Sequence, residues 1–115
     1  MAKLDQCIDF ALERPLWLDD LELGSDPPAE AVKAFCDAFA YRLVERYFAG
    51  ELSWSDADAV ANHYFNLMIQ HCGTRMPDYA WDVYLAFDEG EFGDPGGDAF
   101  TRPRLMEIQS KYGHE

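Results

Sequence analysis

Basic residues are scarce in this chain. Its 115 residues include 22 aspartates and glutamates but only nine lysines and arginines, so the formal net charge at neutral pH is -13. A field of this sign repels phosphate, which argues against nucleic acid and anionic membrane surfaces as partners. Cations and basic proteins are the partners that it favours. Strong acidity also keeps a small protein in solution, so the charge alone leaves a functional and a solubilising interpretation open.

Long apolar runs are missing as well. No uninterrupted apolar stretch approaches the roughly 18 residues of a membrane-spanning helix, and the first residues lack the basic and apolar regions of a signal peptide. The three cysteines, Cys7, Cys36 and Cys72, are an odd number and lie in apolar helical patterns. This arrangement indicates reduced thiols in a core. We therefore predict a cytoplasmic protein of bacterial type.

Motifs of catalysis and metal binding are also absent. The chain has no CxxC or HExxH pattern and none of the signatures GxSxG, GxxxxGK[ST] or GxGxxG. His63 and His71 would lie two helical turns apart, too far to share an ion unless another element, such as one with Cys72 or His114, folded in. His71 and Cys72 would point about 100° apart on a helix, which disfavours a catalytic dyad. We predict no catalytic residue, no cofactor and no metal site, and rank a small enzyme or metal-binding protein third among the possible functions.

An acidic, glycine-rich loop precedes the last expected helix and has one feature of an EF-hand. Counted from Asp88, glycine falls at the sixth position, Gly93. Gly90 and Phe92, however, occupy the third and fifth positions, where calcium requires oxygen ligands. A mobile, solvated loop is the simpler interpretation. The carboxylates that leave weak cation binding open are Asp88, Glu89, Glu91, Asp94 and Asp98.

Apolar residues recur at helical spacing through most of the chain, and no stretch alternates as a strand does for long. The sequence therefore predicts an all-α fold, a single-domain bundle of four to five helices over residues 1–115. The expected helices cover approximately residues 3–13, 27–49, 54–71, 77–89 and 101–112. An irregular, leucine- and aspartate-rich loop near the N-terminus should place its apolar side chains on the core: Leu16, Trp17, Leu18, Leu21 and Leu23.

Capping residues define several of these boundaries. Ser25 or Asp26 is the expected N-cap of the second helix, with the prolines of residues 27–28 in its first turn, where their missing N–H groups cost nothing. Gly50 is the expected residue after that helix. Residues 53–56, SWSD, resemble a capping box for the third helix. The short connection between the two helices predicts that they run antiparallel.

Residues 47–98 contain ten acidic side chains against one basic one, Arg75, together with two tryptophans and four tyrosines. Carboxylates among large amphipathic rings suit the docking of a basic protein, because complementary charge speeds encounter and buried rings provide lasting contact. We expect electrostatic steering followed by anchoring through Tyr79. The predicted partner-binding residues are Asp56, Asp58, Asp78, Tyr79, Asp82, Asp88, Glu89, Glu91 and Asp94.

A second hypothesis is a homo-oligomeric structural or adaptor module. In that case Trp17, Trp54 or Trp81 would form an apolar contact between copies of the chain. Both hypotheses are non-catalytic, and both place the function on the protein's exterior.

One short segment has a family resemblance. Residues 47–56, YFAGELSWSD, combine an aromatic residue, a glycine, an aliphatic residue and a serine cap between two expected helices. This segment resembles the helix–turn–helix of colicin D-like bacterial immunity proteins. The resemblance implies a cytosolic protein that neutralises a cognate toxin, often a basic nuclease, by covering its active site with acidic side chains that stand in for phosphates. It assigns no individual inhibitory residue.

Overall fold

Five α-helices and one 3₁₀ helix make up most of the computed structural model, which describes residues 2–73 and 75–113. No strand occurs within these described residues, so the predicted all-α bundle is confirmed. None of the helices in them has both the length and the apolarity needed to cross a membrane. The elements are α1 (Leu4–Ala11), η1 (Leu18–Leu21), α2 (Ala29–Phe48), α3 (Trp54–His71), α4 (Asp78–Gly90) and α5 (Asp98–Lys111).

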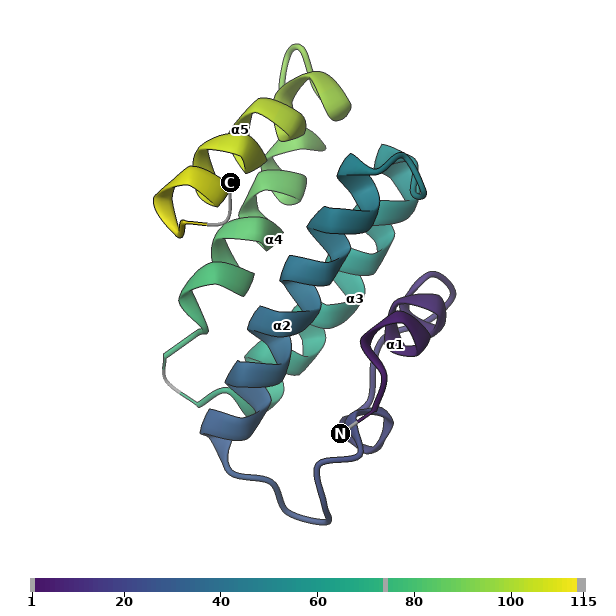
Figure 1. Cartoon of the computed structure of the whole chain (residues 1–115), viewed down its shortest axis with the longest axis vertical. Helices are drawn as coiled ribbons and strands as arrows, with labels where there is room; N and C mark the ends of the chain where they lie inside the picture. Colours follow the sequence, from purple (N-terminus) through teal and green to yellow (C-terminus); the bar gives the residue numbers. More distant parts are fainter. Residues whose placement is uncertain (1, 74, 114–115) are drawn as a thin grey trace.

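Helices α2, α3 and α4 run along the long axis of the molecule in alternating directions (Figure 1). Helix α5 packs on α4, and α1 packs on α2 and α3 at the opposite side of the bundle. The turn between α2 and α3 holds Gly50 at a positive φ of 81°, where a side chain would be strained. Because α3 and α4 run in opposite directions, the start of α3 and the end of α4 lie at the same end of the bundle, where the candidate site is found.

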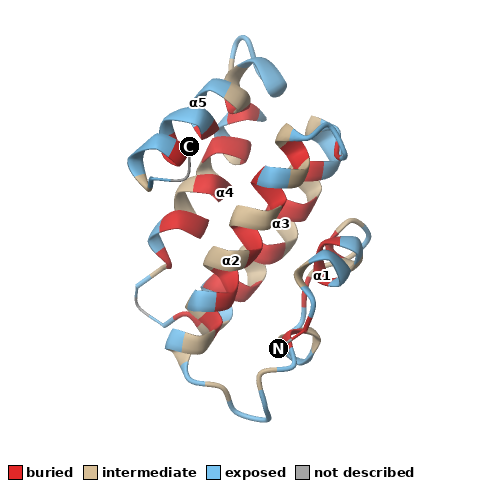
Figure 2. Ribbon diagram, viewed as in Figure 1, coloured by how far each residue is buried: buried red, intermediate tan, exposed pale blue. Residues whose placement is uncertain are grey.

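The core forms between the facing sides of α2, α3 and α4, where Figure 2 shows the buried residues in red. All of the apolar residues that periodicity predicted for α2 are buried: Val32, Phe35, Cys36, Phe39, Leu43 and Tyr47. The three cysteines are free and buried, and the Cys36 and Cys72 thiols hydrogen-bond to each other. From α3, the buried Tyr64 donates its hydroxyl to the Ala80 carbonyl of α4 at 2.7 Å.

Helix α2 begins later than predicted. Its first residue is Ala29 and its N-cap is Pro28, with an extended ψ of 154°; neither Ser25 nor Asp26 caps it. The reason is that a residue preceding proline avoids the helical region, which keeps the chain extended through two consecutive prolines. The third helix starts as predicted, with Ser53 Oγ accepting the Asp56 backbone N–H at 3.1 Å.

Helix α5 begins earlier than predicted, at Asp98 instead of Thr101. Pro103 is only the sixth residue of the helix, so its missing N–H removes a single bond near the start, and its ring lies on the exposed side. The apolar pattern of the expected last helix, read from the sequence, predicts that Leu105 and Met106 both face inward; Leu105 is buried, but Met106 is 62% exposed. The prediction was wrong because successive residues point about 100° apart on a helix, which turns Met106 outward.

The leucine-rich segment after α1 packs on the core, as predicted for Leu16 and Leu21, which are fully buried. The backbone N–H of Leu16 bonds to the His63 carbonyl of α3 at 3.5 Å. Trp17, in contrast, was predicted to pack inward and is 56% exposed. Trp17 adopts an extended conformation before η1, and this reverses its direction relative to Leu16.

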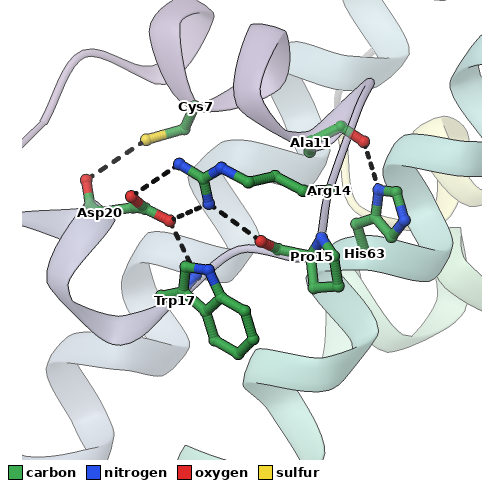
Figure 3. Close-up of polar contacts among 7 residues, drawn as sticks. All are labelled: Cys7, Ala11, Arg14, Pro15, Trp17, Asp20 and His63. Atoms are coloured by element: carbon green, nitrogen blue, oxygen red, sulfur yellow. Dashed lines mark hydrogen bonds and ion pairs between the residues drawn. The ribbon is translucent and has the colours of Figure 1, made fainter.

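An ion pair fixes this segment (Figure 3). The Arg14 guanidinium donates to both carboxylate oxygens of Asp20, at 2.8 and 3.0 Å, and the Trp17 backbone N–H donates to Asp20 at 2.8 Å. The hydrogen bond from Arg14 is the main reason that the pKa of Asp20 lies below its usual range. Close by, His63 contacts the Ala11 carbonyl, so this imidazole connects α3 to α1.

Candidate docking surface

Three carboxylates meet where α3 begins and α4 ends. Asp58 lies in α3, Asp88 in the last turn of α4, and Glu91 directly after α4. Asn62, one turn beyond Asp58, donates Nδ2–H to Glu91 Oε2 at 3.2 Å and to the Asp58 carbonyl at 3.0 Å. Within residues 2–73 and 75–113, none of the three carboxylates forms an ion pair with a base. Asp58, Asp88 and Glu91 are called the acidic cluster below.

The acidic cluster has a high affinity for positive charge. Burial, a hydrogen bond with Glu91 and the charges of Glu91 and Asp88 raise the pKa of Asp58 to about 7. Asp58 Oδ1 is buried without a hydrogen-bond partner among the described groups. Burial, together with the adjacent Asp88, raises the pKa of Tyr84, whose hydroxyl lies 3.4 Å from Asp88 Oδ1. A proton or an incoming cation would therefore stabilise this cluster.

Aromatic rings adjoin the acidic cluster. Phe65 of α3 and Tyr84 of α4 stack with ring centres 4.2 Å apart and planes 8° apart. Trp81 lies 5.9 Å from Phe65 and 5.6 Å from Tyr84, and the Phe65 and Trp81 side chains remain partly exposed. The acidic cluster and these three rings are called the α3–α4 surface. It combines charge with partly accessible apolar area, the two properties expected of a docking site.

Three further predicted residues surround this end of the bundle. Asp56 lies in the first turn of α3, Glu89 in the last turn of α4, and Asp94 in the loop between α4 and α5. All three are exposed, and none forms an ion pair with a described base. The structure thus places six of the nine predicted docking residues at one end of the molecule.

Tyr79 was predicted to be an exposed anchor, and this prediction is wrong. Its side chain is only 4% exposed because α5 packs against this side of α4. Its hydroxyl hydrogen-bonds to Gln109 of α5, and its ring meets Tyr112 edge-on at 5.2 Å. Burial accordingly raises its pKa. Tyr79 belongs to the α4–α5 interface instead of a free surface.

The predicted excess of uncompensated charge is also wrong in part. Of the ten acidic residues between positions 47 and 98, four approach a base. Asp82 receives Lys111 Nζ at 3.1 Å and the Tyr112 hydroxyl at 2.8 Å, because α5 folds back along α4. The other pairs are Glu51 with Arg46 at 3.4 Å, Asp78 with Arg75 at 3.8 Å and Asp98 with Arg102 at 3.2 Å.

The sequence interpretation counted the tryptophans and tyrosines of residues 47–98 toward docking, but it missed Phe65, whose helical spacing on α3 is also that of a core residue. A signal was nevertheless present: Asp58, Asn62 and Phe65 follow the i, i+4, i+7 spacing of one helix face. This is the face of α3 that meets α4, so tracing polar residues along the apolar stripe would have found it.

Most residues of the glycine-rich loop are exposed, in keeping with the predicted solvated loop, although a backbone hydrogen bond closes its base. The Gly97 N–H bonds to the Gly90 carbonyl at 2.8 Å, which closes the loop. A Cβ on Gly96 would lie 2.8 Å from the same carbonyl, too close for any side chain. No group of three or more His, Cys, Asp or Glu residues in the described part of the chain could hold a metal ion. Of the weighed ligands, His114 lies outside the described residues.

Two surface depressions lie away from the α3–α4 surface. The first, of about 430 Å³, adjoins the α4–α5 loop and α5, and the second, of about 470 Å³, lies between α1 and α2. The second is lined by Leu4, Asp37, Ala38, Tyr41, Arg42 and Glu45.

Comparison of the chain with protein-family models, with curated proteins and with solved structures finds no match.

Proposed function

We propose that this protein is a non-catalytic binding protein whose α3–α4 surface docks a basic protein domain. One observation supports this function above the others: carboxylates without a basic partner gather at one end of the bundle, beside partly exposed rings. Elsewhere in the described chain the arginines and lysines are largely engaged by nearby acids. Glu13, Asp19, Glu22 and Asp26 also lack an ion pair among the described residues, so the α3–α4 end is distinguished by its buried Asp58 oxygen and by the rings beside its carboxylates.

The expected mechanism has two stages. The net charge of -13 and the acidic cluster attract a positive surface over a distance of roughly one Debye length, about 8–10 Å at moderate salt. Close contact then covers the exposed parts of Phe65 and Trp81, which takes over the anchoring role first assigned to Tyr79. The first stage governs the association rate and the second the dissociation rate.

The resemblance of residues 47–56 to colicin D-like immunity proteins favours one kind of partner, a toxin domain of nuclease type. A nuclease site is basic because it binds phosphates, so carboxylates at fixed spacing complement it. The segment forms the turn between α2 and α3 that leads directly to Asp56 and Asp58. An inhibitor of this type needs no chemistry of its own.

The test begins with the gene neighbourhood, where a toxin gene with a basic C-terminal domain is expected directly upstream, and it then uses that domain as the binding partner. The variant Asp58→Asn/Asp88→Asn/Glu91→Gln should lower the association rate at least tenfold at low salt, and added salt should slow the wild type likewise. The control Asp19→Asn/Glu22→Gln/Asp26→Asn removes the same three charges from exposed positions near η1 and should have a much smaller effect. Association that ignores both salt and the first variant would contradict the proposal.

Self-association remains the alternative, and it now rests on Trp17. Trp54 donates its indole N–H to Thr101 at 2.9 Å and Trp81 packs among rings, whereas Trp17 is 56% exposed. Light scattering over a hundredfold concentration range separates the two functions. A molar mass that stays at 13.1 kDa would exclude a stable homo-oligomer.

A further inference from the structure

Asp58 and Glu91 form a carboxyl pair between two helices. Asp58 approaches from the first turns of α3, and Glu91 is the C-cap of α4, with its backbone N–H bonded to the Asp88 carbonyl at 3.1 Å. Asn62 donates both to the Asp58 carbonyl at 3.0 Å and to Glu91 Oε2 at 3.2 Å, which brings the Glu91 carboxylate beside Asp58. Asp58 Oδ1 is buried with no hydrogen-bond partner among the described groups. Two carboxylates accept hydrogen bonds and cannot donate one, so a proton must supply the missing bond.

No other group near the pair supplies positive charge. From α3 the pair meets Asn62, which donates to Glu91 Oε2 at 3.2 Å. From α4 it meets Asp88, with the Tyr84 hydroxyl directed at Asp88. No described arginine, lysine or histidine forms an ion pair or hydrogen bond with Asp58, Asp88 or Glu91. With both carboxyls ionised, the neighbourhood would hold three negative charges and no cation.

We propose that Asp58 and Glu91 share one proton in the folded protein and that its release as the pH rises is a switch built into the α3–α4 surface. Below the switch, the protonated Asp58 carboxyl donates to the Glu91 carboxylate and joins α3 to the end of α4. Above it, the proton leaves to water and two adjacent carboxylates repel each other. The raised pKa of Asp58, about 7, agrees with this arrangement.

The switch has two consequences. Repulsion acts where the closed loop after α4 begins, so the junction of α3 and α4 loosens as the pH rises. The acidic cluster also gains a full negative charge, which strengthens docking of a basic partner at higher pH. This second consequence rests on the proposed function, and the first does not.

The decisive experiment is an NMR titration of the side-chain carboxyl carbons in the wild-type protein, between about pH 3 and pH 9. The Asp58 resonance should titrate near pH 7, well above the usual aspartate range. In Glu91→Gln the Asp58 midpoint should fall by about one unit or more, because the amide can donate to an ionised Asp58. The control Glu89→Gln removes an exposed charge two residues away and should shift the midpoint far less.

The pH dependence of the free energy of unfolding, measured with urea, is a second test of the switch. A group whose pKa is raised by folding stabilises the protein below its unfolded pKa, near 4, and this contribution is lost as pH rises through its folded pKa. Wild-type stability relative to Asp58→Asn should therefore fall between about pH 4 and pH 7. A wild-type Asp58 midpoint near 4 would overturn the switch and leave salt-dependent docking intact. A shared proton with docking that ignores salt would instead overturn the proposed function alone.

Discussion

Asp20 and Asp58 are both partly buried aspartates, and their surroundings are opposite. Asp20 faces the fork of Arg14 and a backbone N–H, so its ionised form is satisfied and its pKa is lowered. Asp58 faces Glu91 and Asp88, so its ionised form is disfavoured and its pKa is raised. Asp5, which receives Arg42 at 2.7 Å, follows the first pattern.

The two regions differ because the few arginines and lysines are unevenly distributed along the chain. The N-terminal region contains Arg14 and meets the arginines of α2, whereas the α3–α4 end lies in a stretch of 52 residues with Arg75 as its one base. Charge in the first region stabilises the native packing. Charge in the second region remains unsatisfied within the chain, and we infer that such charge is available for a partner or a proton.

The largest expected effect comes from a substitution that disturbs the packing at the end of α4, beside the acidic cluster. In Gly90→Ala the new Cβ would lie 2.4 Å from Thr101 Oγ1, which already accepts from Trp54 and donates to the Ala86 carbonyl, both at 2.9 Å. Relieving the contact must break one of these bonds, so we expect a loss of about 1–3 kcal/mol in urea unfolding. In a Thr101→Ala background the added cost should shrink. An equal cost in both backgrounds would contradict this explanation.

A smaller effect tests the opposite pH responses. Asp20→Asn should lower the free energy of unfolding by about 1 kcal/mol at neutral pH, because it removes the charge from a partly exposed ion pair. A carboxyl whose pKa is lowered by folding loses its contribution as pH falls through that pKa, so wild type and variant should converge as the pH falls below the usual aspartate range. For Asp58→Asn, the free energy of unfolding should instead differ increasingly from that of the wild type as the pH rises, because the wild type loses the contribution of the protonated Asp58. Parallel profiles for the two variants would contradict the comparison.

Most helices of this fold could be predicted because their signals are local. Ser53 bonds to a backbone N–H three residues away, and the α2 stripe repeats every three to four residues. Where two local signals competed, the prediction failed: Ser25 and Asp26 are good N-caps, but the prolines that follow keep the chain extended past them. The early start of α5 depends on the closed loop before it, and composition alone does not determine that closure.

The site was predicted less well because it depends on contacts between distant residues. Lys111 pairs with Asp82, 29 positions earlier in the chain. Tyr79 is buried by α5, where its hydrogen-bond partner Gln109 lies 30 positions further along. Helical spacing identifies which residues share a face but not which helix covers that face. The six acidic residues left at one end, and the rings beside them, follow from the packing order of α3, α4 and α5.

The smallest expected effect concerns the hydrogen bond that joins the two sides of the acidic end. Asn62→Ala removes the donor to Glu91 Oε2, and an exposed hydrogen bond of this kind contributes roughly 1 kcal/mol or less. Alanine also favours helix by about half a kcal/mol, so the matched control is Asn66→Ala, one turn further along α3.

Relative to that control, Asn62→Ala should destabilise the protein more at pH 8 than at pH 5, because the Glu91 carboxylate has lost Asp58 as a donor at the higher pH and depends on the Asn62 amide. The measurement is urea unfolding of both variants at the two pH values. Equal differences at both would mean that Asn62 supports α3 alone and that no proton links the two carboxyls.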